Sequence, residues 1–259
     1  MPASTPASGT VLITGAARRL GRAIALRFAQ DGWDIGLHYR NSEDEARDAA
    51  REIAALGRRC VLLQGDLGTQ AQIGQVFDRA LQALGSVDAL VNNASVFEYD
   101  DALTATADSV MHHMMPNLVA PVLLTQALSR HIVARGGDTR GVAINLLDQK
   151  LWNLNPDFFS YTLSKASLEA ATTLLAQALA PALRVVGVAP GLTLPSYMQT
   201  EEEFAKTHAL APLGRSSDPE EVARTVLFAA QSRAITGTTL IVDGGQHLMG
   251  LSRDFSLIK

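Results

Sequence analysis

The segment Val11–Ala25 constrains the fold of this chain most, because it reads as a strand, a turn and a helix in immediate succession. It starts with apolar residues, passes through a turn containing Gly15 and Gly21, and continues with a mostly apolar face at helical spacing: Leu20, Ala23, Ile24, Arg27 and Phe28. Glycine at such a turn lets a pyrophosphate approach the free N–H groups and positive dipole of a helix N-terminus. The segment predicts the entrance to a dinucleotide-binding βαβ unit. A glycine-punctuated loop between an ordinary strand and helix has the same pattern.

Composition narrows the class of protein. The chain has 259 residues, a net charge of −4 and a pI of about 5.9, so we expect neither nucleic acid nor an anionic membrane as a partner. Its one cysteine, Cys60, excludes a disulfide within the chain and is expected to be a buried strand residue. Residues 1–9 lack the basic and apolar regions of a secretion signal and are predicted to be a flexible tail. The expected location is the cytoplasm.

Strand patterns alternate with helix patterns along the rest of the chain, without a linker or an internal repeat. This alternation predicts right-handed crossovers and a parallel sheet covered on both faces. We therefore predict an α/β protein, a single-domain Rossmann-type doubly wound seven-stranded sheet over residues 10–259. The strands after the first are expected at Asp34–Tyr39, Cys60–Gln64, Val87–Val91, Val142–Leu147, Arg184–Ala189 and Thr238–Val242. The longer helices are expected at Glu43–Leu56, Thr69–Leu84, Thr104–Arg135 with breaks near Pro116 and Pro121, Phe158–Leu179 and Pro219–Gln231. Thr193–Asp218 reads as a long polar segment.

The residues after the second strand indicate which nicotinamide cofactor binds. An NAD site has a carboxylate about 20 residues after the glycine turn, to accept hydrogen bonds from the ribose 2′-hydroxyl. Here that place holds Arg40, Asn41 and Ser42, which suit a 2′-phosphate, and Arg18 adds charge nearby. The pattern predicts NADP(H). Ser42 and Glu45 also read as a capping box for the next helix, which is compatible with this prediction.

Tyr161 and Lys165 lie four residues apart and so share one face of a predicted helix. A tyrosine titrates near pH 10, and a neighbouring ammonium lowers its pKa toward the range useful for acid–base chemistry. Such a pair is common on helix surfaces, so its context decides. Other motifs occur in the order and spacing of one family, namely Asp66-Leu67, Asn93-Ala94-Ser95, Asn117 and Pro190-Gly191. From about Thr10 to Gly245 the chain resembles the short-chain dehydrogenases/reductases.

The resemblance implies hydride transfer from a nicotinamide, with Tyr161 as the proton donor. Lys165 would orient the nicotinamide ribose, and Asn117 would belong to a proton relay, although a helix kink beside Pro116 and Pro121 also accounts for that asparagine. The family also suggests a homotetramer. The implied cofactor-binding residues are Gly15, Arg18, Arg19, Leu20, Gly21, Tyr39, Arg40, Asn41, Ser42, Asp66, Leu67, Asn93, Ala94, Ser95, Tyr161, Lys165, Pro190, Gly191, Leu192 and Thr193.

One departure from the family pattern bears on the substrate. Most members carry a serine thirteen residues before the tyrosine, where this chain has Asp148. A carboxylate repels a carbonyl oxygen but pairs well with an N–H group, so the substrate is expected to offer nitrogen donors. Asp148 could instead only cap the end of a strand, or mark an inactive relative. The glycine turn also has Arg19 in place of its middle glycine.

Together these departures resemble the pteridine reductases within the family. The resemblance implies NADPH-dependent reduction of a dihydropterin or dihydrofolate-type ring, with Asp148 and Tyr161 supplying the proton. Phe97 would stack on the ring, unless it is core filler, and residues 194–211 would form a substrate lid. The expected substrate-binding residues are Arg19, Ser95, Phe97, Asp148, Tyr161, Leu192 and Tyr197, with Trp152 and Met198 as further pocket candidates.

Two other functions stay open. A family member acting on a carbonyl or alcohol substrate, such as a ketoacyl thioester or a sugar, fits every motif except Asp148. A non-catalytic NADP(H)-binding sensor is disfavoured by the intact Tyr161, Lys165 and Asn117. His112 and His113 have no companion ligands in the sequence, so no metal site is expected. The tail after Gly245 could reach a neighbouring subunit or a pocket, and spacing alone does not determine its role.

Overall fold

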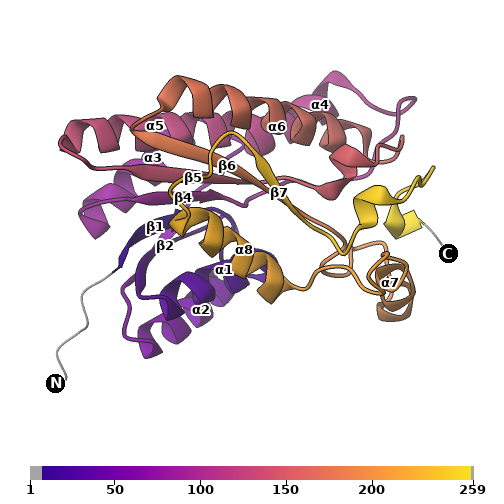
Figure 1. Ribbon diagram of the computed structural model, residues 1–259, viewed down its shortest axis with the longest axis horizontal. Coiled ribbons are helices and arrows are strands. Elements are labelled where there is room, and N and C mark those ends of the chain that lie inside the picture. Colours follow the sequence, from indigo (N-terminus) through magenta and orange to yellow (C-terminus); the bar gives the residue numbers. More distant parts are fainter. Residues whose placement is uncertain (1–7, 258–259) are drawn as a thin grey trace.

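The computed structural model describes residues 8–257, and its strands form one parallel seven-stranded sheet in the order β3-β2-β1-β4-β5-β6-β7 (Figure 1). The predicted doubly wound Rossmann-type α/β fold is confirmed. The strands are β1 Gly9–Ile13, β2 Trp33–Tyr39, β3 Cys60–Gln64, β4 Ala89–Asn92, β5 Gly141–Leu146, β6 Leu183–Pro190 and β7 Thr239–Val242.

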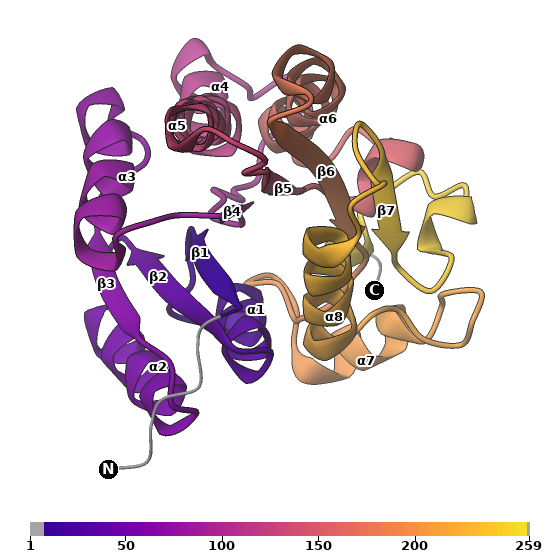
Figure 2. The ribbon, with the colours of Figure 1, turned by 60° about the vertical axis from the view of Figure 1, so that its left-hand side comes forward.

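Helices cover both faces of the sheet, as Figures 1 and 2 show. One layer holds α1 Arg19–Gln30, α2 Glu43–Ala55 and α8 Pro219–Gln231. The other holds α3 Gln70–Leu84, α4 Ala107–Met114, α5 Ala120–Arg135 and α6 Phe159–Leu179. The short helix α7, Glu201–His208, lies beyond the carboxyl end of β7 with the C-terminal segment. The remaining turns are a π-turn at Met115–Val119 and 3-10 turns η2 Gln149–Trp152, η3 Gln246–Leu248 and η4 Phe255–Leu257.

The strands send alternate side chains into two cores. In β1, Val11 and Ile13 pack with the layer of α1 and α8, whereas Leu12 packs with the layer of α3 and α5. All three are fully buried. Since successive strand residues point to opposite faces, a strand buried on both sides needs an unbroken apolar run, which is what the sequence shows here.

The site is set by the point where the order of the strands reverses. β1 lies between β2 and β4, so the loop after β1 and the loop after β4 leave the sheet side by side. The Thr14 hydroxyl accepts hydrogen bonds from the backbone N–H groups of Asn93 and Ala94, at 2.9 and 3.0 Å. In open α/β sheets ligands bind at this crevice, outside the carboxyl ends of the strands.

Several predicted boundaries were wrong. Gly9 belongs to β1, so the predicted tail at residues 1–9 extends too far, and residues 1–7 lie outside the described residues. The fourth strand begins at Ala89 rather than Val87. The predicted polar segment at residues 193–218 contains helix α7, which starts with a capping box between Thr200 and Glu203. That signal was present in the sequence. Among residues 8–257, no helix is long and apolar enough to cross a membrane.

The predicted helix at residues 104–135 is interrupted where the prolines were expected to break it. It begins at Ala107, with a capping box between Thr106 and Ser109, and a π-turn divides it at Met115–Val119. The π-turn arises at Pro116, which has no N–H group to donate to the preceding turn. Asn117 lies within this π-turn, where the spacing of side chains differs from that of a regular α-helix.

Candidate active site

A cavity of about 400 Å3 lies along the carboxyl ends of β1, β2, β3 and β4. Every predicted cofactor residue from the first half of the chain lines it: Gly15, Arg18, Arg19, Leu20, Gly21, Tyr39, Arg40, Asn41, Ser42, Asp66, Leu67, Asn93, Ala94 and Ser95. Ala17, His38, Val96 and Pro116 complete the lining and were not predicted.

The glycine turn leaves the start of α1 open to an anion. Gly15 has φ +63°, and a side chain on Gly21 would lie 2.1 Å from the carbonyl oxygen of Gly15. Helix α1 starts after Arg18 without a side-chain cap and without an acidic residue in its first turn. Its free N–H groups and dipole therefore fit a pyrophosphate, and the exposed guanidinium groups of Arg18 and Arg19 add positive charge.

The side chain of His38 holds the glycine turn by a hydrogen bond to Gly15. Its Nδ1 accepts a hydrogen bond from the Gly15 N–H at 3.1 Å, and Nε2 lies 3.1 Å from the carbonyl oxygen of Gly65. The first contact needs an unprotonated Nδ1, and the second needs a proton on Nε2. Burial lowers the pKa of His38 to about 4, which keeps this neutral tautomer at pH 7.

The far end of the cavity carries Arg40, Asn41 and Ser42, and it suits a phosphate better than a hydroxyl. Glu43, which follows these residues, accepts a hydrogen bond from Nε of Arg47 at 3.1 Å within α2. Ser42 stands at the N-cap of α2, but its side chain makes no capping hydrogen bond. The predicted capping box is therefore wrong, and the hydroxyl is not used by the helix. These residues fit a 2′-phosphate.

A second cavity, of about 520 Å3, continues from the first and shares part of its wall. The shared residues are Arg18, Arg19, Leu20, Asn93 and Ser95. Predicted site residues from the rest of the chain line it: Phe97, Asp148, Tyr161, Lys165, Pro190, Gly191, Leu192, Thr193 and Tyr197. The arrangement brings one end of a cofactor in the first cavity against a substrate in the second.

Asp148 and Tyr161 form the polar centre of the second cavity. The Tyr161 hydroxyl donates to Oδ2 of Asp148 at 2.8 Å, and the backbone N–H of Lys150 donates to Oδ1 at 2.9 Å. Burial raises the pKa of Asp148. Burial and then the Asp148 charge raise the pKa of Tyr161 well above 10. At neutral pH this pair therefore keeps the phenol protonated.

Lys165 faces the same centre but does not touch the phenol oxygen. Its Nζ donates to the Leu146 carbonyl at 2.7 Å and lies 5.7 Å from the centroid of the Tyr161 ring. Burial lowers the pKa of Lys165 to about 8. The expectation that Lys165 lowers the pKa of Tyr161 is thus wrong for this structure, because Asp148 and burial act on the phenol in the opposite direction.

The start of α6 fixes the direction of Tyr161. Asp100 accepts a hydrogen bond from the backbone N–H of Ser160 at 2.9 Å and another from the Ser160 hydroxyl. Asp100 and Ser160 are both buried. The first turn of α6 is therefore anchored one residue before the tyrosine.

Among the predicted catalytic, cofactor-binding and substrate-binding residues, Asn117 alone lines neither cavity. It is 1% exposed, and its amide is used by protein groups. Its Oδ1 accepts from the Val96 N–H at 2.8 Å and from Ser95 Oγ at 3.2 Å, while Nδ2 donates to Val96 O and Ser164 Oγ, both at 2.9 Å. It lies behind the wall of the site and holds the loop after β4 against α6.

Phe97 is both a wall of the second cavity and part of an aromatic cluster. Its ring stacks on Phe158 at a centroid distance of 4.2 Å and meets Tyr161 edge to face at 4.7 Å. Phe158 is fully buried and has φ +53°. The position of Phe97 is thus compatible with both interpretations, stacking on a substrate ring and filling the apolar core.

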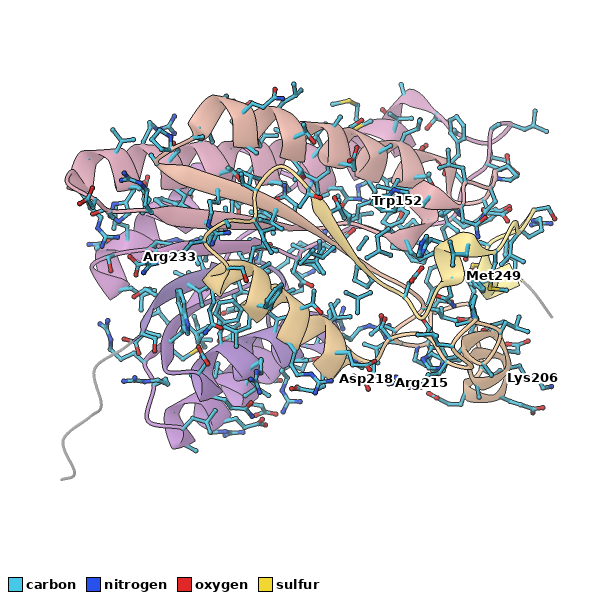
Figure 3. The ribbon with its side chains drawn as sticks, viewed as in Figure 1. Trp152, Lys206, Arg215, Asp218, Arg233 and Met249 are labelled. Atoms are coloured by element: carbon cyan, nitrogen blue, oxygen red, sulfur yellow. The ribbon has the colours of Figure 1, made fainter. Side chains whose placement is uncertain are left out.

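The loop after β6 is tied to the rest of the site. Nη2 of Arg19 donates to the Pro195 carbonyl at 2.7 Å, and the Tyr197 hydroxyl accepts from the Tyr99 N–H at 3.1 Å. The two further pocket candidates, Trp152 and Met198, line neither cavity. Figure 3 places Trp152 at the end of the molecule where Met249 lies, with Arg233 at the opposite end.

The chain's own C-terminal segment also reaches the second cavity, which was one of the two possibilities for the tail after Gly245. Asp254, Phe255 and Ser256 line it, together with Leu194 and Ser196 of the predicted lid and three residues that were not predicted, namely Leu146, Leu147 and Gln149. Burial raises the pKa of the half-buried Cys60 thiol to about 12, so this strand residue is not a nucleophile. Within residues 8–257 no group of three metal-binding side chains comes together.

The fold and site define a dinucleotide-binding oxidoreductase, and comparisons with known proteins agree. A family model described as Enoyl-(Acyl carrier protein) reductase matches residues 15–247. The chain is 30% identical to an L-rhamnose 1-dehydrogenase (NAD(P)(+)) of Sphingomonas, over 92% of this chain and 96% of the relative. It is 32% identical to 3beta-hydroxysteroid dehydrogenase 1 of Eggerthella lenta, over 92% and 94%.

Two solved structures are similar to the whole fold. FolM alternative dihydrofolate reductase 1 from Brucella canis, complexed with NADP, superposes with a TM-score of 0.87 at 38% identity, covering 93% of this chain and 95% of that one. The Brucella suis protein, also with NADP, gives 0.85 at 37% identity, covering 93% and 96%. The prediction of an NADP(H) site agrees with both. The chain belongs to the short-chain dehydrogenase/reductase family.

Proposed function

We propose that this protein is an NADPH-dependent reductase that transfers hydride to a C=N bond of a dihydropterin or dihydrofolate-type ring. The observation that carries the proposal is the 2.8 Å hydrogen bond between the Tyr161 hydroxyl and Asp148 in the wall of the second cavity. A carboxylate beside the proton donor repels a ketone oxygen but accepts a hydrogen bond from an N–H group of a nitrogen heterocycle.

The rest of the cavity suits a flat ring. Phe97 is stacked on one face by Phe158 and reaches the cavity beside Tyr161, so it can form an edge or a platform for the heterocycle. Arg19 and Ser95 lie in the wall shared with the cofactor cavity and offer donors to ring oxygens.

The first cavity fits NADP(H) by its donor set. The open start of α1 with Arg18 would hold the pyrophosphate, and Arg40, Asn41 and Ser42 would hold the 2′-phosphate. When bound, the cofactor supplies the hydride. Lys165, an ammonium below its pKa of about 8, would orient the nicotinamide ribose.

The protein's own groups would manage the proton. The raised pKa of Tyr161 keeps its hydroxyl protonated, and Asp148 orients this hydroxyl by accepting its hydrogen bond at 2.8 Å. As the ring nitrogen gains negative charge during hydride transfer, the Tyr161–Asp148 pair would donate a proton to it. Asn117 would act from behind, by holding Ser95 and Val96 in place.

The two structural neighbours support this choice, since both are alternative dihydrofolate reductases complexed with NADP. The sequence relatives favour a second candidate, because they act on a sugar and a steroid. In that case the chain would be a short-chain reductase or dehydrogenase of a carbonyl or alcohol. Asp148, in place of the family's usual serine, argues against it.

One assay separates the candidates. NADPH oxidation is measured with dihydrobiopterin, dihydromonapterin and dihydrofolate. It is also measured with a panel of ketones, sugars and steroids, and the reverse reaction is followed as NADP+ reduction with the sugars and steroids. Turnover of the pterin or folate substrates alone supports the proposal. Turnover of carbonyls or alcohols alone rejects it in favour of the second candidate, and tight NADPH binding without turnover of any compound indicates a sensor. A lid at residues 194–211 and a homotetramer remain predictions.

A further inference from the structure

A buried lysine lies two residues after the catalytic carboxylate. Lys150, in turn η2, has a side chain that is 3% exposed, and no step of the proposed reaction uses it. Its Nζ lies 2.9 Å from Oδ2 of Asp254 and donates to the carbonyl oxygen of Asp157 at 2.7 Å. It also lies 5.4 Å from the centroid of the Phe158 ring, beneath the aromatic cluster of the site.

The same residue is joined to the reacting groups through its main chain. The Lys150 N–H donates to Oδ1 of Asp148 at 2.9 Å, while Oδ2 of Asp148 accepts from Tyr161. A displacement of η2 would therefore move one of the two hydrogen bonds that orient the carboxylate. The Lys150 side chain holds η2 against Asp254 of the C-terminal segment. Because the Lys150 N–H also orients Asp148, the orientation of this carboxylate is linked to the C-terminal segment.

The segment on the other side of this ion pair forms part of the substrate cavity. Asp254, Phe255 and Ser256 line the cavity, and Phe255 is 4% exposed. Oδ1 of Asp254 accepts from the Ser256 N–H at 3.0 Å and from its hydroxyl at 2.7 Å. The Asp254 carboxylate thus holds the local turn with one oxygen and Lys150 with the other.

Asp157 closes the network. Its Oδ2 accepts hydrogen bonds from Nε of Arg253 and from the backbone N–H of Asp254, both at 2.8 Å. Its backbone carbonyl accepts the hydrogen bond from Nζ of Lys150. Asp157 is 3% exposed. Hydrogen bonds from Arg253 and Asp254 lower the pKa of this carboxyl despite its burial. The loop before α6 and the C-terminal segment are therefore held together by charged groups at both ends.

We propose that Lys150 and Asp254 form a clasp that fastens residues 253–256 over the substrate cavity and keeps Asp148 aligned with Tyr161. Lys150 is a positioning residue, and Asp254 belongs to the wall that selects the substrate. For the identity of that substrate the inference rests on the proposed function. A misplacement of about 1 Å at a reacting group can cost about 100-fold in rate, so a distant clasp of this kind can control turnover.

The test compares Lys150→Met, Asp254→Asn and the double variant with the wild-type protein. Arg51→Met is the matched control, because Arg51 pairs with Asp48 on the exposed surface of α2. With a dihydropterin, each clasp variant is expected to lose about 10- to 100-fold in kcat/KM, with KM raised, and to keep its NADPH Kd within about twofold. Arg51→Met should match the wild type.

The double variant guards against a trivial failure to fold. Lys150→Met leaves the Asp254 carboxylate without its partner, which destabilises a partly buried charge, and Asp254→Asn removes that charge. If the two residues act as one clasp, the double variant loses no more activity than Lys150→Met alone. Additive losses, or full turnover by Lys150→Met, would overturn the proposal.

Hydrogen–deuterium exchange gives a readout that does not depend on the substrate. In Lys150→Met, amides of residues 249–257 are expected to exchange faster, while those of β1 and α1 keep wild-type protection. Unchanged protection at residues 249–257 would reject the clasp even if no pterin is turned over. Faster exchange in a protein whose wild type reduces only ketones would instead support the clasp and reject the proposed substrate.

Discussion

The hydroxyl of Tyr161 donates a hydrogen bond to Oδ2 of Asp148 at 2.8 Å. Burial, followed by the charge and the hydrogen bond of Asp148, raises the pKa of Tyr161 and keeps the phenol neutral. A neutral phenol at this place in the wall of the second cavity is in the protonation state that a proton donor needs.

Tyr161→Phe removes the hydroxyl and leaves the ring contacts with Phe97 in place. Turnover of the pterin substrate is expected to fall about 100- to 10,000-fold, the usual contribution of a general acid. NADPH binding, measured by the fluorescence of the bound cofactor, should stay within about twofold, because the first cavity is unchanged. A variant that keeps a near-wild-type rate would show that Tyr161 is not the proton donor.

Asp148→Asn keeps the shape of the side chain and removes its charge. Because the Asp148 charge is one cause of the raised pKa of Tyr161, this variant is expected to titrate Tyr161 at a lower pH than the wild type. The measurement is the phenolate absorbance as a function of pH, with Asp148→Asn/Tyr161→Phe subtracted to isolate one tyrosine. An unchanged titration would mean that burial alone sets this pKa.

Arg40→Ala tests the 2′-phosphate site. The loss of a charge-assisted contact costs about 1.5 to 3 kcal/mol, so kcat/KM for NADPH should fall about 10- to 150-fold. Activity with NADH should stay within about twofold, because NADH has no 2′-phosphate. Arg51→Ala on the exposed surface of α2 is the control and should not change the preference. Equal losses with both cofactors would place Arg40 outside the phosphate site.

Most of the fold and the cofactor site follow from local sequence patterns. The roles of these residues depend on neighbours close in the chain or on the ends of adjacent strands. This holds for the apolar run Val11–Ile13, for Gly15 and Gly21, and for Arg40. Strand pairing then brings their loops together, and the period of two fixes which side chains face each core. For this reason the predicted cofactor residues of the first half of the chain all reach one cavity.

What the sequence could not predict depends on long-range or rotational detail. The Lys150–Asp254 ion pair joins residues 104 positions apart, and no periodic pattern marks either of them. The direction of Asn117 depends on a π-turn, which shifts the side chains by less than one turn of helix. The pKa of Tyr161 was predicted from Lys165, since the burial of the phenol and its contact with Asp148 appear only in three dimensions.

His38 makes the stability of the fold depend on pH. Its folded pKa is about 4 against 6.5 for the free side chain, so between these values the unfolded chain binds the extra proton. The stability that this group contributes is present above pH 6.5 and is lost as the pH falls toward 4, by about 3 kcal/mol. His38→Gln should flatten the dependence of Tm on pH in this window. A variant that keeps the wild-type slope would assign the acid sensitivity to other groups.

Gly21 and Gly74 offer a matched pair of glycine-to-alanine changes within helices. A methyl group on Gly21 would lie 2.1 Å from the carbonyl oxygen of Gly15 and 2.6 Å from Nδ2 of Asn93, so the turn must shift. At Gly74, an exposed residue of α3, a methyl group meets nothing within 4 Å. Gly21→Ala is expected to destabilise the protein by about 1 to 3 kcal/mol and to weaken NADPH binding.

Gly74→Ala is expected to stabilise the protein by about 0.5 to 1 kcal/mol, because alanine loses less backbone entropy in a helix. Urea unfolding measures both changes, and a cofactor titration measures the second effect of Gly21→Ala. If Gly21→Ala binds NADPH as the wild type does, the pyrophosphate does not lie against this turn. Since Gly74→Ala leaves the turn untouched, its cofactor affinity should equal that of the wild type, which separates contact with the cofactor from general stability.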